Sequence, residues 1–399
     1  MRLCVLTPFF YPHTGGSEEY SLKLHAYLKQ LDPSINIDII CYNTDQAPET
    51  ETYQQLFIYR IPSVTLLPDQ FVLPNYFSLI KLLRQLKQRH VYDVVISQTR
   101  FFDNSWWAPL VAKYFKARSI LIDHCAGYPR HANLVVNALS RLFDHLIFPL
   151  VARCYDLVIG SSQAVINWHQ QLGVGDTQLI YGGVDTQFFY PVKKATGRTI
   201  PNLNQEFRPD DIIISFAGRM IKSKGPQFLA EAAQKLRQSN QNLYFIFAGI
   251  GPLNLELSKY QNKGIFFLGN LNKAQIRELF QATDIVVQPS SHPEGISNTL
   301  LEAGAMARAV ITTASGGTLE LIEADKTGLI IQPTVFDVEQ AIEKLVKNAK
   351  LRNSLGQNLR QTVVQNFDWQ MIAKRYLELF SGLVRRSPPR AGGGGGGGI

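Results

Sequence analysis

Two glutamates, Glu294 and Glu302, stand eight residues apart in the segment Ser290–Ile311, whose sequence is SSHPEGISNTLLEAGAMARAVI. The segment follows an apolar run, residues 285–288, that is typical of a buried strand, and its own apolar spacing predicts a helix. Glu294 is expected in the loop and Glu302 about one turn into the helix. There Glu302 can accept hydrogen bonds from a ribose diol and Glu294 from sugar hydroxyls. The alternative is a capped amphipathic helix with two surface glutamates.

The loop in front of this helix is suited to binding an anion. A helix N-terminus presents unpaired backbone N–H groups and the positive end of the helix dipole. We therefore expect a phosphate to be contacted there by the backbone of Gly295, Ile296, Ser297 and Asn298.

Two cations, Arg219 and Lys224, follow an expected strand at Asp211–Ala217. A diphosphate leaving group gains negative charge as its bond to a sugar breaks, and two cations with backbone donors can stabilise it without a metal. The chain has no Asp-x-Asp motif and no cluster of His, Asp and Glu at metal-ligand spacing. The sequence therefore predicts no metal and no cofactor. The alternative for the two cations is an ordinary surface position.

The glycine pair Gly15-Gly16 follows the first expected strand, Leu3–Thr7. Glycine lets the backbone come close to a phosphate or a sugar, so Gly16 is a candidate contact. The loop is not a G-x-G-x-x-G fingerprint, which disfavours a nicotinamide cofactor.

Short apolar runs alternate with helical patterns in both halves of the chain, which predicts an α/β protein of βαβ units with parallel sheets. The expected strands are 3–7, 35–41, 93–97, 119–123, 157–160 and 178–181, then 211–217, 243–248, 265–268, 284–288 and 310–313. The expected helices are 17–31, 77–88, 132–154, 225–238, 273–281, 299–307, 336–365 and 369–383. Since ligands bind beyond the carboxyl ends of parallel strands, two such domains would hold a ligand in the cleft between them.

The boundaries of these units follow from changes in composition. Residues 1–190 are expected to form the first domain, the proline-containing residues 191–210 a linker, and residues 211–366 the second domain. Residues 367–385 form a last helix, and residues 386–399 a flexible tail with seven consecutive glycines.

The net charge of +8 lies entirely in the second half of the chain, because residues 1–190 carry 15 basic and 15 acidic residues. A phosphate-bearing ligand, a nucleic acid, an anionic membrane or a solvated surface could each explain it. No nucleic-acid-binding motif is present, so nucleic acid is not expected as a partner. Four scattered cysteines and the lack of any apolar run of about 20 residues favour a cytoplasmic protein.

The segment around Glu294 and Glu302 resembles the E-x7-E signature of retaining glycosyltransferases of family 4, which have the GT-B fold. The resemblance covers about residues 1–385. Further motifs of that family are matched by Gly15-Gly16-Ser17-Glu18, Gly183-Val184-Asp185, Gly218-Arg219 with Lys224-Gly225, Gly249-Ile250-Gly251, Gly316-Gly317 with Glu320, and Phe367-Asp368-Trp369.

This resemblance implies two Rossmann-like domains facing a central cleft, with a C-terminal helix that crosses back to the first domain. It implies a retaining glycosyltransferase that uses a UDP- or GDP-linked sugar as its substrate and a glycan, lipid-linked or small-molecule acceptor. Glu302, Gly249 and Gly251 would contact the nucleotide, and Glu294 the reacting sugar. The alternatives are a sugar-nucleotide epimerase or phosphorylase of the same architecture, and a non-catalytic sugar-nucleotide binding protein.

In the same family a histidine near the position of His124 contacts the donor sugar, so the resemblance makes His124 a catalytic candidate, with Asp123 as the competing residue. One departure is that Ala307 and Ala309 stand where family members often have Gly and Pro. Both lie in a turn that touches no expected ligand atom.

An apolar stripe at Leu134–Val151 has two interpretations. It could meet lipid-linked sugars at a membrane surface, giving peripheral association, or it could be a core-facing helix of the first domain, which we favour. The expected acceptor loops 44–53, 101–107 and 126–133 carry no recognisable code, and nothing indicates the oligomeric state.

Overall fold

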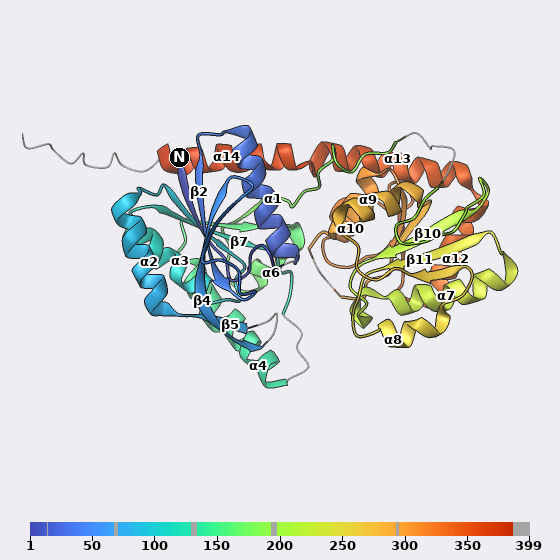
Figure 1. Ribbon diagram of the computed structural model, residues 1–399, viewed down its shortest axis with the longest axis horizontal. Helices are drawn as coiled ribbons and strands as arrows, with labels where there is room; N and C mark the ends of the chain where they lie inside the picture. Colours follow the sequence, from blue (N-terminus) through green and yellow to red (C-terminus); the bar gives the residue numbers. More distant parts are fainter. Residues whose placement is uncertain (14, 68–70, 129–133, 193–197, 293–294, 386–399) are drawn as a thin grey trace, which may run out of the picture.

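Two α/β domains lie side by side, and the C-terminal helices run along both of them (Figure 1). This computed structural model describes residues 1–13, 15–67, 71–128, 134–192, 198–292 and 295–385. Each domain is built on its own mainly parallel sheet, as the alternation of apolar runs and helical patterns predicts.

The sheet of the N-terminal domain has the order β3-β4-β2-β1-β6-β7-β8-β9, with β5 paired to β4. Its strands are parallel except β3 and β5, which are antiparallel to β4. The bounds are β1 Arg2–Leu6, β2 Asn36–Asn43, β3 Thr50–Tyr53, β4 Leu56–Leu67, β5 Phe71–Pro74, β6 Val94–Gln98, β7 Arg118–Asp123, β8 Leu157–Gly160 and β9 Thr177–Leu179.

Helices cover both faces of this sheet. On one face, α1 (Gly16–Leu31) and α14 (Trp369–Arg385) share a core with residues such as Val5 and Ile96. On the other face, α2 (Tyr76–Arg89), α3 (Asn104–Phe115) and α5 (Phe148–Ala152) pack on residues such as Leu6 and Val95. Because consecutive strand residues face opposite sides, strands covered on both faces are apolar throughout.

The C-terminal sheet is parallel, with the order β12-β11-β10-β13-β14-β15. The strands are β10 Ile212–Ala217, β11 Leu243–Ala248, β12 Ile265–Phe267, β13 Ile285–Gln288, β14 Ala309–Thr313 and β15 Leu329–Ile331. The strand order reverses between β10 and β13, and the crevice beyond the carboxyl ends at such a reversal is where doubly wound domains bind ligands.

Helices α7 (Pro226–Ser239) and α12 (Val335–Lys347) cover one face of this sheet. The other face is covered by α9 (Lys273–Ala282) and α10 (Asn298–Ala305), with α13 (Ala349–Asn366) packed on α10. Two short helices, α8 (Asn254–Leu257) and α11 (Thr318–Leu321), follow β11 and β14. Phe189 and Ile200 are buried in this second core, so residues around the expected linker 191–210 pack on the C-terminal domain.

Two of the expected helices are divided. The helix expected at 336–365 is two helices, because Asn348 leaves helical geometry and its side chain caps the next helix at Leu351 N (2.9 Å). The helix expected at 132–154 begins among residues of which 129–133 lie outside the described part. It then runs as α4 (Leu134–Leu142), a π-helical turn at Phe143–Ile147, and α5. The π turn brings Asp144 inward, where Arg100 binds it.

Several elements were not expected. The acceptor loop expected at 44–53 contains β3, and the one expected at 101–107 contains the start of α3, whereas 129–133 of the third loop lie outside the described residues. Strands β4, β5 and β15 and helix α6 (Gln163–Gln171) were also missed. Helix α3 carries Pro109 in its interior, and β15 has only three residues, so their local signals are weak.

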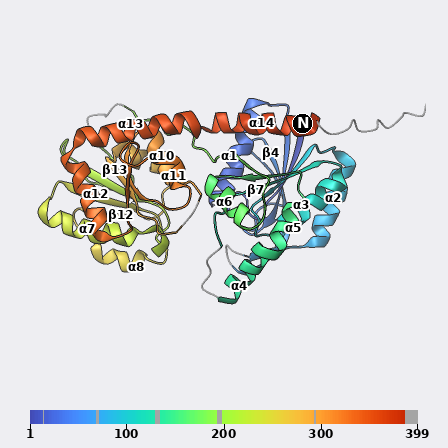
Figure 2. The same cartoon turned by 180° about the vertical axis from the view of Figure 1, so that it is seen from behind.

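The C-terminal helix joins the domains. It follows α13 after a break at Phe367 and Asp368, and Asp368 forms an isolated parallel bridge with Val184. On the N-terminal domain the Tyr376 hydroxyl lies 2.7 Å from that of Tyr20 in α1. Figure 2 shows α13 and α14 spanning both domains from behind.

A stability prediction follows from Gly304 in α10. A Cβ atom there would lie 2.8 Å from Leu359 Cγ and 2.8 Å from Val363 Cγ2 of α13. We expect Gly304→Ala to lower the free energy of unfolding by about 1–2 kcal/mol, because overpacking outweighs the helix propensity gained. Urea denaturation measures the change. The matched control is Gly382→Ala in α14, where a Cβ atom meets nothing within 4 Å and the propensity gain should appear alone. Equal changes in the two variants would contradict the packing argument.

Candidate active site

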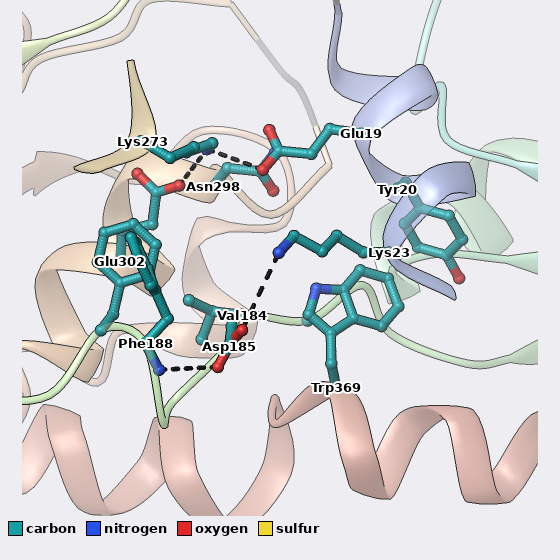
Figure 3. Close-up of a pocket in the computed structure, with 12 residues that line it drawn as sticks. Glu19, Tyr20, Lys23, Val184, Asp185, Phe188, Lys273, Asn298, Glu302 and Trp369 are labelled. Carbon is teal, nitrogen blue, oxygen red and sulfur yellow. Dashed lines mark hydrogen bonds and ion pairs between the residues drawn. The ribbon is translucent and has the colours of Figure 1, made fainter. Parts of the chain in front are cut away.

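A cavity of about 170 Å³ lies between the two domains at the carboxyl end of the second sheet (Figure 3). Helix α1 contributes Glu19, Tyr20 and Lys23, and the C-terminal domain contributes side chains of α9 and α10. Trp369 and the segment after β9, including Asp185, complete its walls. Residues from both domains therefore surround one small space, as expected for a ligand held in a cleft.

Glu302 lies in the wall of this cavity with only 6% of its surface exposed. Its carboxylate pairs with Lys273 at the start of α9, and Lys273 Nζ also lies 2.9 Å from Glu19 Oε1 across the cleft. Burial raises the pKa of Glu302 above its usual value, although the nearby Lys273 opposes the shift. The lysine thus favours the charged form of a nearly buried carboxyl group in the cavity wall.

The pKa of Lys273 is also subject to two opposing influences. Burial alone would lower the pKa of Lys273, but Glu302 and Glu19 outweigh it and hold the pKa above its usual value. Figure 3 shows the ammonium group between the two carboxylates, with Asn298 beside them. The three charges tie α1 of the first domain to α9 and α10 of the second.

The N-terminus of α10 enters the same space. Ser297 is its N-cap without a side-chain capping bond, and Asn298 lines the cavity. Thr299 Oγ1 donates to the carbonyl of Ala217 at 3.1 Å, which holds the helix against the end of β10. The backbone N–H groups of this turn thus lie where the chain can bind an anion.

The preceding loop packs closely on its neighbours. A Cβ atom on Gly295 would lie 3.4 Å from the carbonyl oxygen of His124, so the two domains approach each other at this point. Gly317 packs as closely on Ile296. Glu294, the other member of the expected glutamate pair, lies outside the described residues.

Arg219 and Lys224 lie on one turn beyond β10, and that turn interlocks with its neighbours. Gly249 has a φ of +135°, and a Cβ atom on it would clash with the carbonyl of Gly218 at 1.9 Å. Gly251 abuts Met220 in the same way. The two glycines expected to contact a nucleotide thus have a packing role, since they let the loops after β10 and β11 meet. Arg219 is exposed and Lys224, in the 3₁₀ turn Lys222–Lys224, is half-buried.

His124 follows β7, is half-buried, and contacts Tyr20 of the cavity wall. Its Nε2 lies 3.0 Å from Gln98 Oε1, and its ring centroid is 4.3 Å from that of Tyr20. Burial lowers the pKa of His124 to about 4, so its imidazole is neutral at pH 7. Since Gln98 Oε1 can only accept, the single N–H of the neutral ring is at Nε2, and Nδ1 can accept a hydrogen bond from a sugar hydroxyl without adding charge there.

Asp123, the competing residue, is fully buried away from the cavity. Its Oδ2 accepts from Arg100 Nη1 at 2.5 Å and lies 2.8 Å from His169 Nε2. Burial would raise the pKa of Asp123, but Arg100 and His169 hold it well below its usual range. Asp123 is thus saturated by its partners, and of the two candidates His124 is the one beside the cavity.

Arg100 was not predicted as a site residue from the sequence, yet its side chain binds several groups at and after the end of β7. It is fully buried, and besides Asp123 it donates to the carbonyls of Cys125 (2.7 Å) and Gly127 (2.9 Å) and to Asp144 of the π turn (3.1 Å). It therefore sets the course of the chain directly after His124. A lone arginine in a loop gives no sequence signal of this role.

Gly16, the expected contact of the first loop, begins α1, and a Cβ atom on it would meet nothing within 4 Å. Its neighbour Gly15 has the stronger steric requirement, because a Cβ atom there would lie 2.3 Å from Glu18 Oε2. Glu18 is nearly buried, and although burial raises the pKa of its carboxyl, hydrogen bonds from His13, its own backbone and Ser17 lower it overall.

A second contact between the domains comes from Glu320, which follows the glycine pair after β14. Its carboxylate accepts from the backbone N–H of Gln163 at 2.5 Å and of Ala164 at 3.1 Å, at the N-terminus of α6. Sequence motifs indicated Glu320 but not its partner. Among the cavity residues, a motif also included Asp185, whereas Glu19, Lys23 and Lys273 were missed, because their meeting depends on how the domains face each other.

Two features are absent from the described residues. No group of three or more His, Cys, Asp or Glu side chains there could hold a metal ion. In the same part of the chain, no helix has the length and apolar character that crossing a bilayer requires.

Comparisons with known proteins agree on one family. The model of glycosyltransferase family 4 matches residues 14–188, and that of glycosyl transferases group 1 matches residues 202–362. An uncharacterized glycosyltransferase of Methanocaldococcus jannaschii is 26% identical over 96% of this chain and 99% of its own length. The GPI3 subunit of phosphatidylinositol N-acetylglucosaminyltransferase from Saccharomyces cerevisiae is 25% identical over 96% of this chain and 83% of its own.

Solved structures show the same fold. Sucrose-phosphate synthase from Thermosynechococcus elongatus superposes with a TM-score of 0.76, at 19% identity over 97% of this chain and 100% of that one. Anabaena HepE in complex with UDP gives 0.72, at 18% identity over 96% of this chain and 100% of that one. The expected GT-B fold is therefore confirmed. The chain belongs to glycosyltransferase family 4 and is a glycosyltransferase.

Proposed function

We propose that this glycosyltransferase takes its sugar from a nucleotide-diphosphate sugar bound between the domains and transfers it, with retention of configuration, to an acceptor hydroxyl. The observation that carries the proposal is the cavity in which the nearly buried Glu302 carboxylate stands beside the N-terminus of α10. One end of the cavity thus suits a diol and the adjoining turn suits a phosphate, which are the two features that UDP- and GDP-linked sugars combine.

In this proposal the ribose hydroxyls donate to Glu302. The diphosphate lies against the N-terminus of α10, with Arg219 and Lys224 on the neighbouring turn. The sugar then points towards the gap between the loop at Gly295 and His124, where Glu294 is expected to accept from its hydroxyls. His124, which is neutral and gives its one N–H to Gln98, accepts a hydrogen bond from a sugar hydroxyl from the other domain.

The chemical step then needs no metal. The bond between the anomeric carbon and the diphosphate oxygen breaks, and its electron pair leaves with the nucleoside diphosphate. Arg219, Lys224 and the α10 N–H groups stabilise the charge that develops there. The acceptor oxygen attacks from the same face and its proton passes to a phosphate oxygen, which yields retention without a nucleophile supplied by the chain. The glutamate pair acts as a ligand-holding pair, unlike the acid and nucleophile of a retaining glycosidase.

Properties of relatives support the donor class and leave the acceptor class broad. HepE of Anabaena has been determined with UDP and with UDP-glucose. Relatives include an N-acetylglucosaminyltransferase subunit, an alpha-maltose-1-phosphate synthase and a capsular polysaccharide biosynthesis glycosyltransferase. We propose a UDP- or GDP-linked donor and a glycan, lipid-linked or small-molecule acceptor. The four cysteines, all among the described residues, form no disulfide, which supports work in a reducing compartment such as the cytoplasm.

The test combines binding and turnover. Titration calorimetry with UDP and GDP should show binding of at least one nucleotide in the presence of EDTA. Incubation with a panel of UDP- and GDP-sugars and acceptors, followed by mass spectrometry, should then show nucleoside diphosphate released together with a glycosylated product of retained configuration. No binding of either nucleotide would refute the donor proposal. Binding without release would favour a non-catalytic protein, and an altered sugar nucleotide without transfer would favour an epimerase.

A further inference from the structure

We propose that the outer surface of α2, α3 and the α4–α5 segment docks on an anionic lipid bilayer. This surface, called here the outer helical face, exposes large apolar side chains on three neighbouring helical segments. Its most exposed members are Phe77 (87%), Leu110 (62%), Leu150 (61%), Leu139 (60%), Leu146 (59%), Leu142 (53%) and Trp106 (45%). A contiguous apolar surface of this kind is unusual unless it meets a partner or a membrane.

Aromatic contacts make the outer helical face continuous. Tyr76 of α2 and Trp107 of α3 have ring centroids 5.0 Å apart, and Trp106 of α3 stacks on Phe143 of the π turn at 5.5 Å. Lys87 of α2 lies 3.7 Å from the ring centroid of Tyr114 in α3. Figures 1 and 2 show α2 and α3 on the same side of the N-terminal sheet, with α4 extending beyond them.

The charges on this face have one sign. Between Phe71 and Arg153 the chain has only the acidic residues Asp93, Asp103, Asp123 and Asp144. None is exposed: Asp103, Asp123 and Asp144 are buried, and Asp93 binds the backbone N–H of Arg2 at 2.8 Å. The exposed cations of the face include Lys81, Arg84, Lys87, Lys113, Lys116 and Arg141.

The net charge of the first domain does not reveal this positive surface. Residues 1–190 are neutral, with 15 basic and 15 acidic residues, but at least six of these basic residues are exposed on this face and none of the acidic ones is. A surface that mixes leucine and tryptophan with lysine and arginine, and lacks carboxylates, is complementary to a layer of anionic headgroups over hydrocarbon. A nucleic acid would use the cations but would gain little from exposed leucines.

The π turn explains why this segment does not fold into the core. Asp144 points inward and is held by Arg100, while Leu146 and Ile147 are exposed (59% and 41%). In α5 only Phe148 and Ala152 are buried, and Leu150 faces outward. The favoured expectation of a core-facing helix is therefore wrong for most of this segment, because a buried ion pair fixes the helix with its leucines outside.

Docking through the outer helical face would leave the donor cavity accessible. Helix α1, which lines the cavity, packs on the opposite face of the N-terminal sheet from α2, α3 and α5. The proposal is independent of the donor and acceptor proposed above, since it concerns where the protein works and not what it transfers.

The test is co-sedimentation of the full chain with vesicles. We expect binding to phosphatidylcholine vesicles that contain about 30% phosphatidylglycerol, weaker binding to phosphatidylcholine alone, and release at about 0.5 M NaCl. The apolar variant Leu142→Ser/Leu146→Ser/Leu150→Ser should lower the partition coefficient by about tenfold or more. The charge variant Lys81→Glu/Arg84→Glu/Lys113→Glu should lower it roughly a hundredfold.

Matched controls lie on the C-terminal domain. Leu255→Ser/Phe336→Ser/Val364→Ser removes exposed apolar side chains there, and Lys344→Glu/Lys347→Glu/Lys350→Glu reverses exposed charges. Both should sediment like the wild type. Calorimetry with UDP and GDP on each variant reports the donor site separately. Equal sedimentation of the outer-face and control variants, no preference for anionic vesicles, or binding to an RNA oligomer in place of vesicles would overturn the proposal.

Discussion

Replacing Arg219 and Lys224 together by alanine is expected to lower kcat/KM for sugar transfer by about 10³-fold or more, while the chain stays folded. Both side chains lie on the turn that follows β10, at the point where the strand order of the second sheet reverses. The turn is fixed on both sides, by Gly249 and Gly251 and by the hydrogen bond from Ser291 N to Ser223 O at 2.8 Å. Because these contacts of neighbouring backbone fix the turn, loss of the two side chains should remove charge without moving it.

Binding of a nucleoside diphosphate, compared with binding of the nucleoside without phosphates, shows whether Arg219 and Lys224 act on the diphosphate. If the two cations act on the diphosphate, the variant should bind the nucleoside diphosphate more weakly than the wild type but bind the unphosphorylated nucleoside equally well. Calorimetry with both ligands measures this, and steady-state kinetics should show a larger loss in kcat than in binding, since leaving-group charge is greatest in the transition state.

The control for this pair is Lys222→Ala. Lys222 is exposed in the same 3₁₀ turn as Lys224, so it matches the lost charge and the local backbone. It should retain transfer within a few-fold of the wild type, as is usual for a change in a screened surface charge. Near-normal turnover in the double variant, or an equal loss in Lys222→Ala, would exclude the diphosphate role.

The parts of this protein that could be predicted from its sequence are those with local signals. The strand, loop and helix around Glu302 were expected within a residue or two, because a buried strand, a glycine and an apolar helical period each leave a mark over a few positions. The turn at Ala307 was expected to depart from the family, and Ala307 does adopt the left-handed region with a φ of +55°, where glycine has no steric penalty.

The parts that could not be predicted depend on pairs far apart in the chain. Arg100 meets Asp123 and Asp144, and Lys273 meets Glu19, only after strands and domains have taken their places. The π turn is another example. The apolar stripe at 134–151 fits a single amphipathic helix, and nothing in that stripe shows that Asp144 will be drawn inward by an arginine from another loop.

Glu302→Gln is the second change with a large expected effect: about 10- to 100-fold weaker binding of the nucleoside diphosphate. Hydrogen bonds from ribose hydroxyls to a carboxylate are charge-assisted, at about 1.5–3 kcal/mol each, and glutamine keeps the shape while it removes the charge. The control is Glu343→Gln, which removes a carboxylate paired with Lys347 at 2.6 Å on the surface of α12. That variant should bind the nucleotide like the wild type.

Two functions of Glu302 must be distinguished, since it could act on the ribose or only hold Lys273 in place. The wild type should bind the ribonucleoside diphosphate much more tightly than its 2′,3′-dideoxy analogue, because the analogue cannot donate to the carboxylate. In Glu302→Gln this discrimination should largely vanish. If instead both ligands weaken equally and the discrimination remains, Glu302 acts only through Lys273 and the ribose role is wrong.

Lys273→Met is expected to make nucleotide binding depend on pH, which tests the role of the Glu302 charge. Burial already raises the pKa of Glu302, and Lys273 is the largest influence that opposes it. Without the cation the pKa rises further, so the carboxyl becomes protonated at a higher pH than in the wild type. A protonated carboxyl accepts ribose hydroxyls less well, and nucleotide affinity in Lys273→Met should therefore be low in mild acid and recover as the pH rises. The wild type should vary much less over the same range, and equal pH profiles would show that the ammonium group does not govern the charge of Glu302.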